Sequence, residues 1–227
     1  MLVLTIDTST ADSAVGLVRW SREDESWLLL GEERSLGNVH VEQLAPMIER
    51  ALGEGRKDEL EAVVVGLGPG PYTGLRIGIA TAAAYGDALG LPVYGVCGLD
   101  AIADEALGSE PETKNLLVVT DAKRREVFWA RYRDGQRTEG PGVCKPSELP
   151  ELLGGFVPEA VAGAAYLLDG GALQDVRKSC VVAPAAAGLA RSASRAMLAG
   201  EAPAPLAALY LRPPDAVPPA SMKGVLS

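Results

Sequence analysis

Two segments of this sequence that lie far apart open in the same way. Residues 2–6 form a continuous apolar run that leads into Asp7, and residues 116–120 form a second run that leads into Asp121. Unbroken apolar runs of this length are typical of strands that are covered on both faces. Because segments with the pattern of antiparallel strands follow each run, the sequence predicts one α/β unit used twice.

The other expected elements agree with a duplication. In the first half, strands are expected at 2–6, 13–20, 26–34, 62–67 and 92–96, and helices at 41–52, 73–89 and 100–107. In the second half, strands are expected at 116–120, 126–133 and 136–143, and a helix at 185–198. Asp134 and Gly135 form a typical hairpin turn. Pro46 predicts a kink or a later start for its helix, and Asp100 is expected to cap the helix that it opens.

This order of elements predicts an α/β fold with mixed sheets flanked by helices. Residues 108–115 are polar and rich in turn formers, so we expect one lobe at 1–107 and a second at 108–227. Residues 144–180 carry little pattern. The proline-rich end, residues 203–227, is expected either to pack back onto the N-terminal lobe or to form a flexible tail.

Charge and composition restrict the partners of the chain. Hydrophobic residues make up 48% and aromatic residues only 5% of the 227 residues, and the formal net charge is −9. Few aromatic residues argue against a surface that stacks many bases, and the negative charge repels a phosphate backbone. The two halves differ in charge without giving a basic patch. If the protein acts on a nucleic acid, we expect another protein to supply most phosphate contacts.

Cysteines and apolar runs indicate the compartment. Cys97, Cys144 and Cys180 are odd in number and widely spaced, which favours reduced structural thiols over a disulfide framework. The N-terminal run has no basic flank of the kind that precedes a signal-peptide core, and no apolar run approaches the ~20 residues of a membrane span. We therefore expect a soluble, cytoplasmic protein.

The composition gives little support to catalysis by this chain. His40 is the only histidine, and no pair of closely spaced cysteines accompanies it. A catalytic zinc or iron centre needs about three protein ligands, and a nucleophilic triad would have to use His40. A magnesium site made of carboxylates stays open, but no residue pattern selects one. We expect neither catalytic nor metal-ligating residues.

The most distinctive segment, residues 66–78, is rich in glycine, follows a buried strand and opens a helix. Backbone N–H groups at the start of a helix can bind anions, which makes Gly70, Tyr72, Thr73 and Arg76 candidate anion contacts. The segment matches neither a P-loop nor a dinucleotide-binding motif.

Small residues recur every four positions in the helix that follows: Gly74, Gly78, Ala82 and Gly86. Such a stripe allows close approach of another backbone, either the sheet beneath or a helix of a partner. The apolar face of the helix at 41–52 lies near it in sequence and can join the same contact.

Residues 68–78, GPGPYTGLRIG, closely resemble the signature of the bacterial TsaB (YeaZ) family of tRNA threonylcarbamoyladenosine biosynthesis proteins. Residues 6–10, 121–128 and 210–216 are also similar to segments of this family. The resemblance covers residues 1–107 almost throughout and the second half only at those two islands.

The resemblance implies a fold of the actin, sugar-kinase and Hsp70 type, related to ribonuclease H, with two similar lobes. It also implies a non-catalytic partner of the TsaD enzyme, which transfers a threonylcarbamoyl group to an adenosine of tRNA. By the same resemblance, a TsaE-like ATPase joins the assembly, and this protein contacts tRNA only through the complex. TsaD has a histidine pair that binds metal, whereas this chain offers only His40 in that region.

On this basis we expect the two helices to form the surface that contacts TsaD, and to form a homodimer when the chain is alone. The expected interface residues are Val41, Leu44, Ala45, Ile48, Leu52, Gly74, Leu75, Gly78, Ala82 and Gly86.

The family fold also places phosphate-binding turns after the first strand of each half. Asp7, Thr8 and Ser9 form the first turn, and Asp121 opens the second. Bulky Lys123, Arg124 and Arg125 follow Asp121 where nucleotide binders usually carry glycine, so we interpret both turns as vestigial and expect no cofactor. The basic run is either a solvated turn or a surface for an acidic partner. A nucleotide-binding kinase or ATPase and a peptidase acting on the partner stay open as alternatives.

Overall fold

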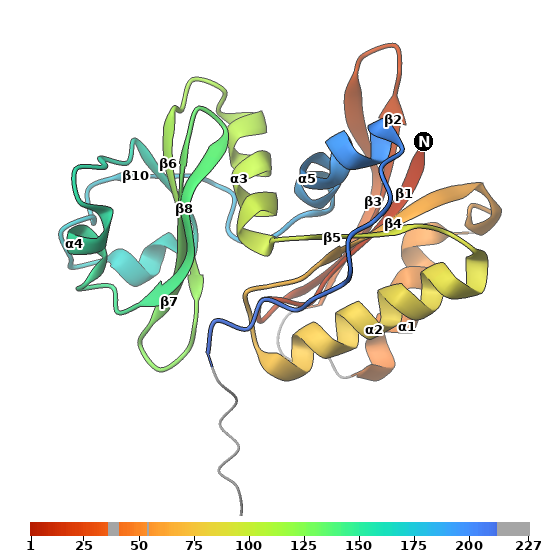
Figure 1. Cartoon of the computed structure of the whole chain (residues 1–227), viewed down its shortest axis with the longest axis horizontal. Helices are drawn as coiled ribbons and strands as arrows, with labels where there is room; N and C mark the ends of the chain where they lie inside the picture. Colours follow the sequence, from red (N-terminus) through yellow and green to blue (C-terminus); the bar gives the residue numbers. More distant parts are fainter. Residues whose placement is uncertain (36–40, 54, 213–227) are drawn as a thin grey trace, which may run out of the picture.

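The protein forms two lobes, each built on one five-stranded sheet (Figure 1). The structure is a computed structural model and describes residues 1–35, 41–53 and 55–212. In chain order, the elements of the first half are β1 (Leu2–Asp7), β2 (Ser13–Ser21), β3 (Ser26–Ser35), α1 (Val41–Leu52), η1 (Lys57–Glu59), β4 (Leu60–Gly66), α2 (Tyr72–Leu89), β5 (Val93–Val96) and α3 (Gly98–Ser109). Those of the second half are β6 (Asn115–Asp121), β7 (Val127–Arg133), β8 (Gln136–Cys144), α4 (Leu149–Leu153), β9 (Ala160–Gly163), η2 (Ala165–Leu168), β10 (Arg177–Lys178) and α5 (Ala186–Ala199).

The two sheets have the same topology. Their strand orders are β3-β2-β1-β4-β5 and β8-β7-β6-β9-β10. In each sheet the first strand pairs antiparallel with the second and parallel with the fourth. The predicted duplication and the predicted α/β class with mixed sheets are therefore confirmed.

Helices cover both faces of the N-terminal sheet. Alternate strand residues point to opposite faces, so Leu4 and Ile6 lie in a core with α1, whereas Val3 lies in a second core with α5. The predicted continuous apolar run of β1 is thus explained by burial on both sides. Pro46 lies inside α1, which begins at Val41 despite it.

The lobes exchange their last helices. Helix α3, expected to belong to the N-terminal lobe, packs on the C-terminal sheet, and α5, from the second half, packs on the N-terminal sheet. The two helices cross so closely that a Cβ on Gly188 would lie 2.2 Å from the carbonyl oxygen of Ala101. The expected division at residues 107 and 108 separates the strands of the two sheets, but each of these helices packs on the sheet of the other half.

The chain crosses the N-terminal lobe again after α5, as an extended strap that comprises residues 203–212. The Leu209 N–H donates to the Leu67 carbonyl over 2.8 Å, and the side chain of Leu206 packs against the N-terminal core. The strap contains no helix. Residues 203–212 thus pack back onto the N-terminal lobe, and residues 213–227 lie outside the described part.

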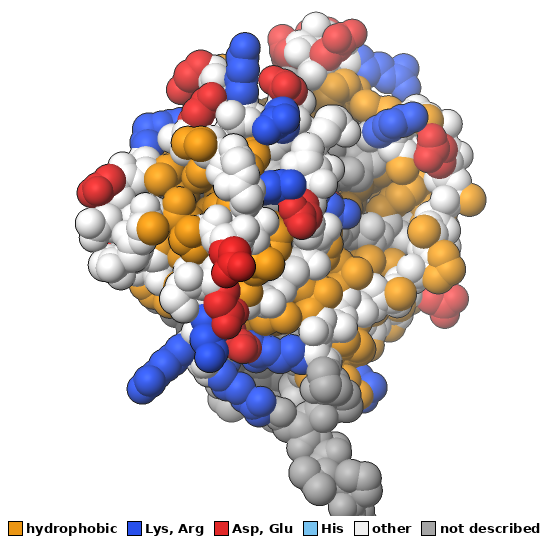
Figure 2. Space-filling view, turned by 60° about the vertical axis from the view of Figure 1, so that its left-hand side comes forward, with side chains coloured by type: hydrophobic (Ala, Val, Ile, Leu, Met, Phe, Trp, Pro, Cys, Tyr) orange, Lys and Arg blue, Asp and Glu red, His pale blue; other side chains and the backbone are white. Residues whose placement is uncertain are grey.

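The surface carries both signs of charge. Lys and Arg side chains gather at the lower edge of the face in Figure 2, below acidic side chains. Within residues 1–35, 41–53 and 55–212, no helix is long and apolar enough to cross a membrane.

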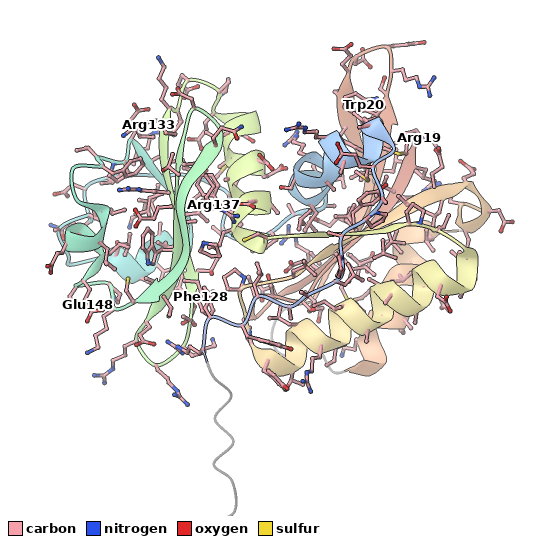
Figure 3. The ribbon with its side chains drawn as sticks, viewed as in Figure 1. Arg19, Trp20, Phe128, Arg133, Arg137 and Glu148 are labelled. Atoms are coloured by element: carbon pink, nitrogen blue, oxygen red, sulfur yellow. The ribbon has the colours of Figure 1, made fainter. Side chains whose placement is uncertain are left out.

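The segment between β8 and α5 contains elements that the sequence did not predict. They are α4, β9, η2 and β10, none longer than five residues. Glu148 precedes α4 at the outer side of the C-terminal lobe, whereas Phe128 and Arg137 lie on the side of β7 and β8 that faces α3 and the N-terminal lobe (Figure 3).

Candidate functional site

Most of the predicted interface residues are buried within this chain. Leu44, Ile48, Leu52, Leu75 and Ala82 are at most 3% exposed. Gly78 and Gly86 are also buried, and Gly74 is half-buried. Ala45 alone among the side chains described in this set is exposed, while that of Val41 lies outside the described part. The prediction that these residues face a partner is therefore wrong for the buried ones.

The small-residue stripe allows α2 to lie directly on its own sheet. A Cβ on Gly78 would lie 2.2 Å from Thr8 Oγ1, and a Cβ on Gly86 would lie 2.2 Å from a methyl carbon of Val93. Real Cβ atoms do not approach so closely. The stripe thus meets the sheet beneath it, which was the other possibility in the sequence.

The outward side of α2 and the strap form a shallow apolar groove, which we call the α2 groove. It is lined by Arg76, Ile79, Ala80, Ala83, Leu206, Ala208 and Tyr210. Ala80 and Tyr210 are exposed, and Ile79 and Ala83 are half-buried. This groove, rather than the buried stripe, is an apolar part of the helix that stays accessible.

The first predicted phosphate turn is closed. A Cβ on Gly70 would lie 2.0 Å from the Ser9 carbonyl oxygen, and one on Gly74 would lie 2.7 Å from that of Thr8. The Thr8 hydroxyl donates to the Gly74 carbonyl over 2.7 Å. The start of α2 therefore occupies the space that a phosphate would need.

Asp7 lies beneath this closed turn and is 1% exposed. Its carboxylate accepts bonds from the N–H and hydroxyl of Ser9, at 2.9 and 2.8 Å. Burial raises the pKa of Asp7 to about 6, although the bonds from Ser9 and the charge of Arg34 oppose the rise. Asp7 is thus a buried turn acceptor.

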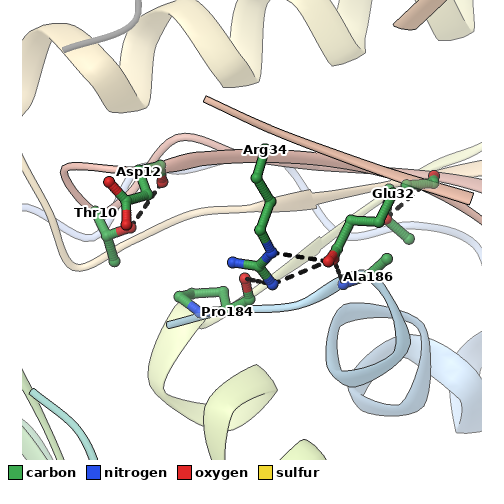
Figure 4. Close-up of polar contacts among 8 residues, drawn as sticks. Thr10, Asp12, Glu32, Arg34, Pro184 and Ala186 are labelled. Carbon is green, nitrogen blue, oxygen red and sulfur yellow. Dashed lines mark hydrogen bonds and ion pairs between the residues drawn. The ribbon is translucent and has the colours of Figure 1, made fainter. Parts of the chain in front are cut away.

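Arg34 ties the start of α5 to the edge of the N-terminal sheet (Figure 4). Its guanidinium donates to Glu32 and, over 3.4 Å, to the Pro184 carbonyl. Glu32 Oε1, which also accepts a hydrogen bond from Arg34 Nη2, accepts the N–H of Ala186, the first residue of α5, over 2.8 Å. Carboxylates at this place satisfy free N–H groups of a helix, so these contacts fix where α5 begins.

The second predicted phosphate turn is open and charged. Lys123, Arg124 and Arg125 are exposed and have φ values of 60°, 56° and 61°, in the left-handed region. Asp121 accepts from the Lys123 N–H at 2.7 Å and from its ammonium at 2.8 Å. Burial opposes ionisation of Asp121, but the contacts with Lys123 outweigh it, so its pKa lies below the ordinary value.

A pocket lies between the lobes beside this turn, and we call it the interlobe pocket. It is lined by Gly70, Pro71, Tyr72, Asp121, Ala122, Lys123, Arg124, Phe128, Tyr210, Leu211 and Arg212. Of the predicted anion contacts, Gly70 and Tyr72 line it and Thr73 does not. Arg76 lies next to it in the α2 groove, over the ring of Tyr72 at 3.9 Å.

Arg212 is a member of this pocket that the sequence did not predict. Its guanidinium donates to the Ala122 carbonyl over 2.7 Å and forms an ion pair with Glu126. The strap thereby reaches the β6–β7 turn. The signal available in the sequence was only that Arg212 falls within a segment similar to the family.

A polar cluster joins α3 to strands β7 and β8 of the C-terminal sheet. Asp100 accepts from the Tyr132 hydroxyl at 2.8 Å and from Arg137 at 3.0 Å. The expected cap is wrong, because Cys97 precedes α3 and no side chain caps it. Burial raises the pKa of Asp100, while Tyr132 and Arg137 oppose the rise.

In the described part of the chain, no three His, Cys, Asp or Glu residues gather in a way that could hold a metal ion. His40 lies outside that part. Cys97 and Cys144 are buried, Cys180 is exposed, and all three are free thiols.

Comparisons with known proteins place this architecture in a family. The model of the family TsaD, tRNA N6-adenosine threonylcarbamoyltransferase, matches residues 35–199. An uncharacterised protein of Mycobacterium tuberculosis is 47% identical over 222 residues, which is 95% of this chain and 94% of that protein. The tRNA threonylcarbamoyladenosine biosynthesis protein TsaB of Escherichia coli is 34% identical over 164 residues, 67% of this chain and 66% of that protein.

Solved structures agree. YeaZ from Pseudomonas aeruginosa has a TM-score of 0.71 and 25% identity, and the match covers 89% of this chain and 96% of that one. A ROK family glucokinase from Streptomyces griseus, at 13% identity and a TM-score of 0.52, covers 87% of this chain and 100% of that chain and shares the fold. The family match spans well over half of the sequence, and the chain belongs to the TsaB (YeaZ) type of the TsaD-like family.

Proposed function

We propose that this protein takes part in the biosynthesis of threonylcarbamoyladenosine in tRNA, as a non-catalytic partner of a TsaD-like enzyme. The relatives named TsaB support the pathway. The observation that carries the non-catalytic role is the closed first turn, where the start of α2 lies on Thr8 and Ser9. A kinase or ATPase of this fold would need that space for phosphate, so nucleotide turnover falls to other members of the assembly.

The α2 groove supports a partner contact. Its apolar residues lie on the outward side of α2 and on the strap. An apolar helical surface is typical of contacts between proteins. We therefore assign the groove to the TsaD-like enzyme and, in the chain alone, to a second copy, while a TsaE-like ATPase joins the complex elsewhere.

Removal of the gene tests the pathway. Nucleosides from digested tRNA are separated and quantified by mass spectrometry. Threonylcarbamoyladenosine is expected to disappear in the deletion strain and to return when the intact gene is restored. Unchanged amounts of the modified nucleoside in the deletion strain would contradict the proposal.

Calorimetry with magnesium and ATP tests the non-catalytic role, and no tight binding by the isolated chain is expected.

A charge in the groove tests the contact. Ala80→Glu is expected to reduce co-purification of the TsaD-like enzyme at least tenfold and to shift any homodimer to monomer in gel filtration, because it places a carboxylate in an apolar contact. Ala88→Glu is the matched control, since Ala88 is exposed on the same helix outside the groove. Equal co-purification of both variants would remove the groove from the interface.

A TsaD-like enzyme that stays intact after long mixing with this protein would exclude the alternative that the protein is a peptidase acting on its partner.

A further inference from the structure

Five cationic residues from three separate segments either line the interlobe pocket or lie next to residues that line it. Lys123 and Arg124 line the pocket with Arg212, Arg125 follows them in the same turn, and Arg76 lies beside Tyr72 at its border. We call these five residues the cationic cluster. Figure 2 shows Lys and Arg gathered at the lower edge of the molecule, the level of the β6–β7 turn in Figure 1. The sequence prediction of no basic patch is wrong here, because folding joins segments that are distant in the chain.

Two acids among the described residues pair with members of the cluster. Asp121 is engaged by Lys123 and Glu126 by Arg212. Arg125 is exposed and forms no ion pair with any residue in the described ranges. The described residues of the cluster therefore keep a surplus of positive charge in a chain whose net charge is −9. Such a local surplus attracts a polyanion to one place and leaves the rest of the surface repulsive.

Aromatic rings border the same place. Tyr72 and Tyr210 stack with centroids 4.8 Å apart, and both stay about two-fifths exposed. Arg76 lies over Tyr72 and donates to the Tyr210 hydroxyl at 3.3 Å. Cations that meet phosphates beside exposed aromatic and guanidinium planes are the usual chemistry of contacts with RNA.

Free nucleotide is the less suitable occupant. A nucleotide in the cleft of this fold would be held by both phosphate turns, and the first is closed because Gly70 and Gly74 lie directly against the backbone of Ser9 and Thr8. The second turn is exposed, and its side chains reach both the pocket and the surface.

We propose that the cationic cluster binds phosphodiesters of RNA, with the Tyr72–Tyr210 pair beside them. This inference rests on the proposed function, which supplies tRNA as the RNA. It adds a direct contact between this chain and the tRNA, whereas the family resemblance implies contact only through the complex.

Binding of an unmodified tRNA transcript to the full chain, alone and mixed with its TsaD-like enzyme, tests the proposal. Fluorescence anisotropy is measured over a series of salt concentrations. The double variant Lys123→Gln/Arg125→Gln is expected to bind at least tenfold more weakly near 0.1 M salt. Its slope of log K against log salt should be smaller by about two, because each lost phosphate contact removes about 0.9 from the slope.

The matched control is Arg22→Gln/Arg56→Gln, which changes the net charge equally at exposed arginines of the N-terminal lobe and is expected to bind as the unaltered chain does. Urea midpoints of both double variants check that each is folded. Equal losses in both double variants, an unchanged slope, or no tRNA binding with or without the enzyme would overturn the proposal. Loss of enzyme co-purification with tRNA binding intact would assign the cluster to an acidic protein instead.

A competition arm separates RNA from nucleotide. ATP at matched ionic strength is expected not to displace the tRNA, and displacement with one ATP bound per chain would overturn the RNA assignment. Failure of this inference is distinct from failure of the proposed function. The deletion strain can lack threonylcarbamoyladenosine while the double variant still binds tRNA normally, and only the inference then fails.

Discussion

The turns after β1 and β6 occupy equivalent places in two sheets of the same topology, yet their surroundings are opposite. Asp7 is 1% exposed beneath α2, whereas the side chain of Asp121 is 34% exposed beside Lys123. The difference follows from the element after the fourth strand of each sheet. After β4 comes α2, with 18 residues, and after β9 comes η2, with four. A long helix covers the turn, and a single short turn of helix leaves it open.

A duplicated unit can therefore keep its strand order while one copy of a turn becomes part of the core and the other becomes surface. Burial removes the first turn from contact with ligands. Exposure leaves the second turn able to carry charges that contact another molecule. We expect changes at the two turns to differ in size and in sign.

The largest expected effect tests the closure of the first turn. Gly78→Leu should lower the free energy of unfolding by about 3 kcal/mol, because overpacking of a tight contact is destabilising and the new side chain meets Thr8. Urea unfolding measures it. Ala84→Leu, on the exposed side of α2, is the control and should change stability by less than about 0.5 kcal/mol. A folded Gly78→Leu protein of unchanged stability that no longer binds its partner would show that the stripe faces outward after all.

The second prediction compares the two acids. Asp7→Asn should raise the free energy of unfolding at pH 7 by about 2 kcal/mol. Ionising a carboxyl whose pKa is raised by about two units opposes folding by about 3 kcal/mol, and the amide offsets part of this gain because it accepts the bonds from Ser9 less strongly. Asp121→Asn should lower it slightly, since it removes an exposed ion pair. Chemical unfolding of both variants at pH 7 gives the two signs. Equal signs would contradict the contrast between the turns.

The pH dependence gives the same contrast. The folded-state pKa of Asp7 is about 6 and its ordinary value is 3.8. In the unaltered protein, the contribution of Asp7 to the free energy of unfolding is therefore fully present below pH 4 and is lost as the pH rises through 6. For Asp121, whose pKa is lowered, stability is present above its ordinary value and is lost as the pH falls. The advantage of Asp7→Asn should therefore vanish near pH 4, which unfolding curves at several pH values can measure.

The smallest expected effect lies in the open turn. Arg125→Gly should raise stability by a few tenths of a kcal/mol at most, because glycine adopts the left-handed conformation without steric cost but loses more backbone entropy on folding. Thermal unfolding measures the change, and Asp134→Gly, at another left-handed residue in a hairpin, is the control. A loss above about 1 kcal/mol would mean that the Arg125 side chain holds the turn.

Local patterns made most elements predictable. The apolar runs and the alternation of β1, β2, β6 and β7 predicted strands close to the observed ones, since burial on one or both faces leaves a period in the sequence. Strands of four and two residues, such as β9 and β10, are too short to show a period. They were not predicted.

The direction in which a face points was not predictable. The sequence pattern of the apolar residues of α1 and of the stripe of α2 is the same whether a sheet of the same chain or a partner protein covers them. In the structure, Leu44 and Gly78 are core residues. Of the candidate site, the turns could be located from the family resemblance. The contact of Arg212 with Ala122 depends on the path of the strap, which no local pattern records.

The exchange of α3 and α5 has a consequence for synthesis of the chain. Val3, Val18 and Ala62 present one side of the first sheet to α5, a helix that ends at Ala199. While a ribosome is still translating the second half, that side has no covering helix and is open to chaperones or to aggregation. The sheet that is made first is therefore covered only after the strands of the second sheet have been made. A nascent chain halted after Lys178 but before Ala199 has left the exit tunnel would carry all strands of the C-terminal sheet beside an N-terminal sheet with one bare face.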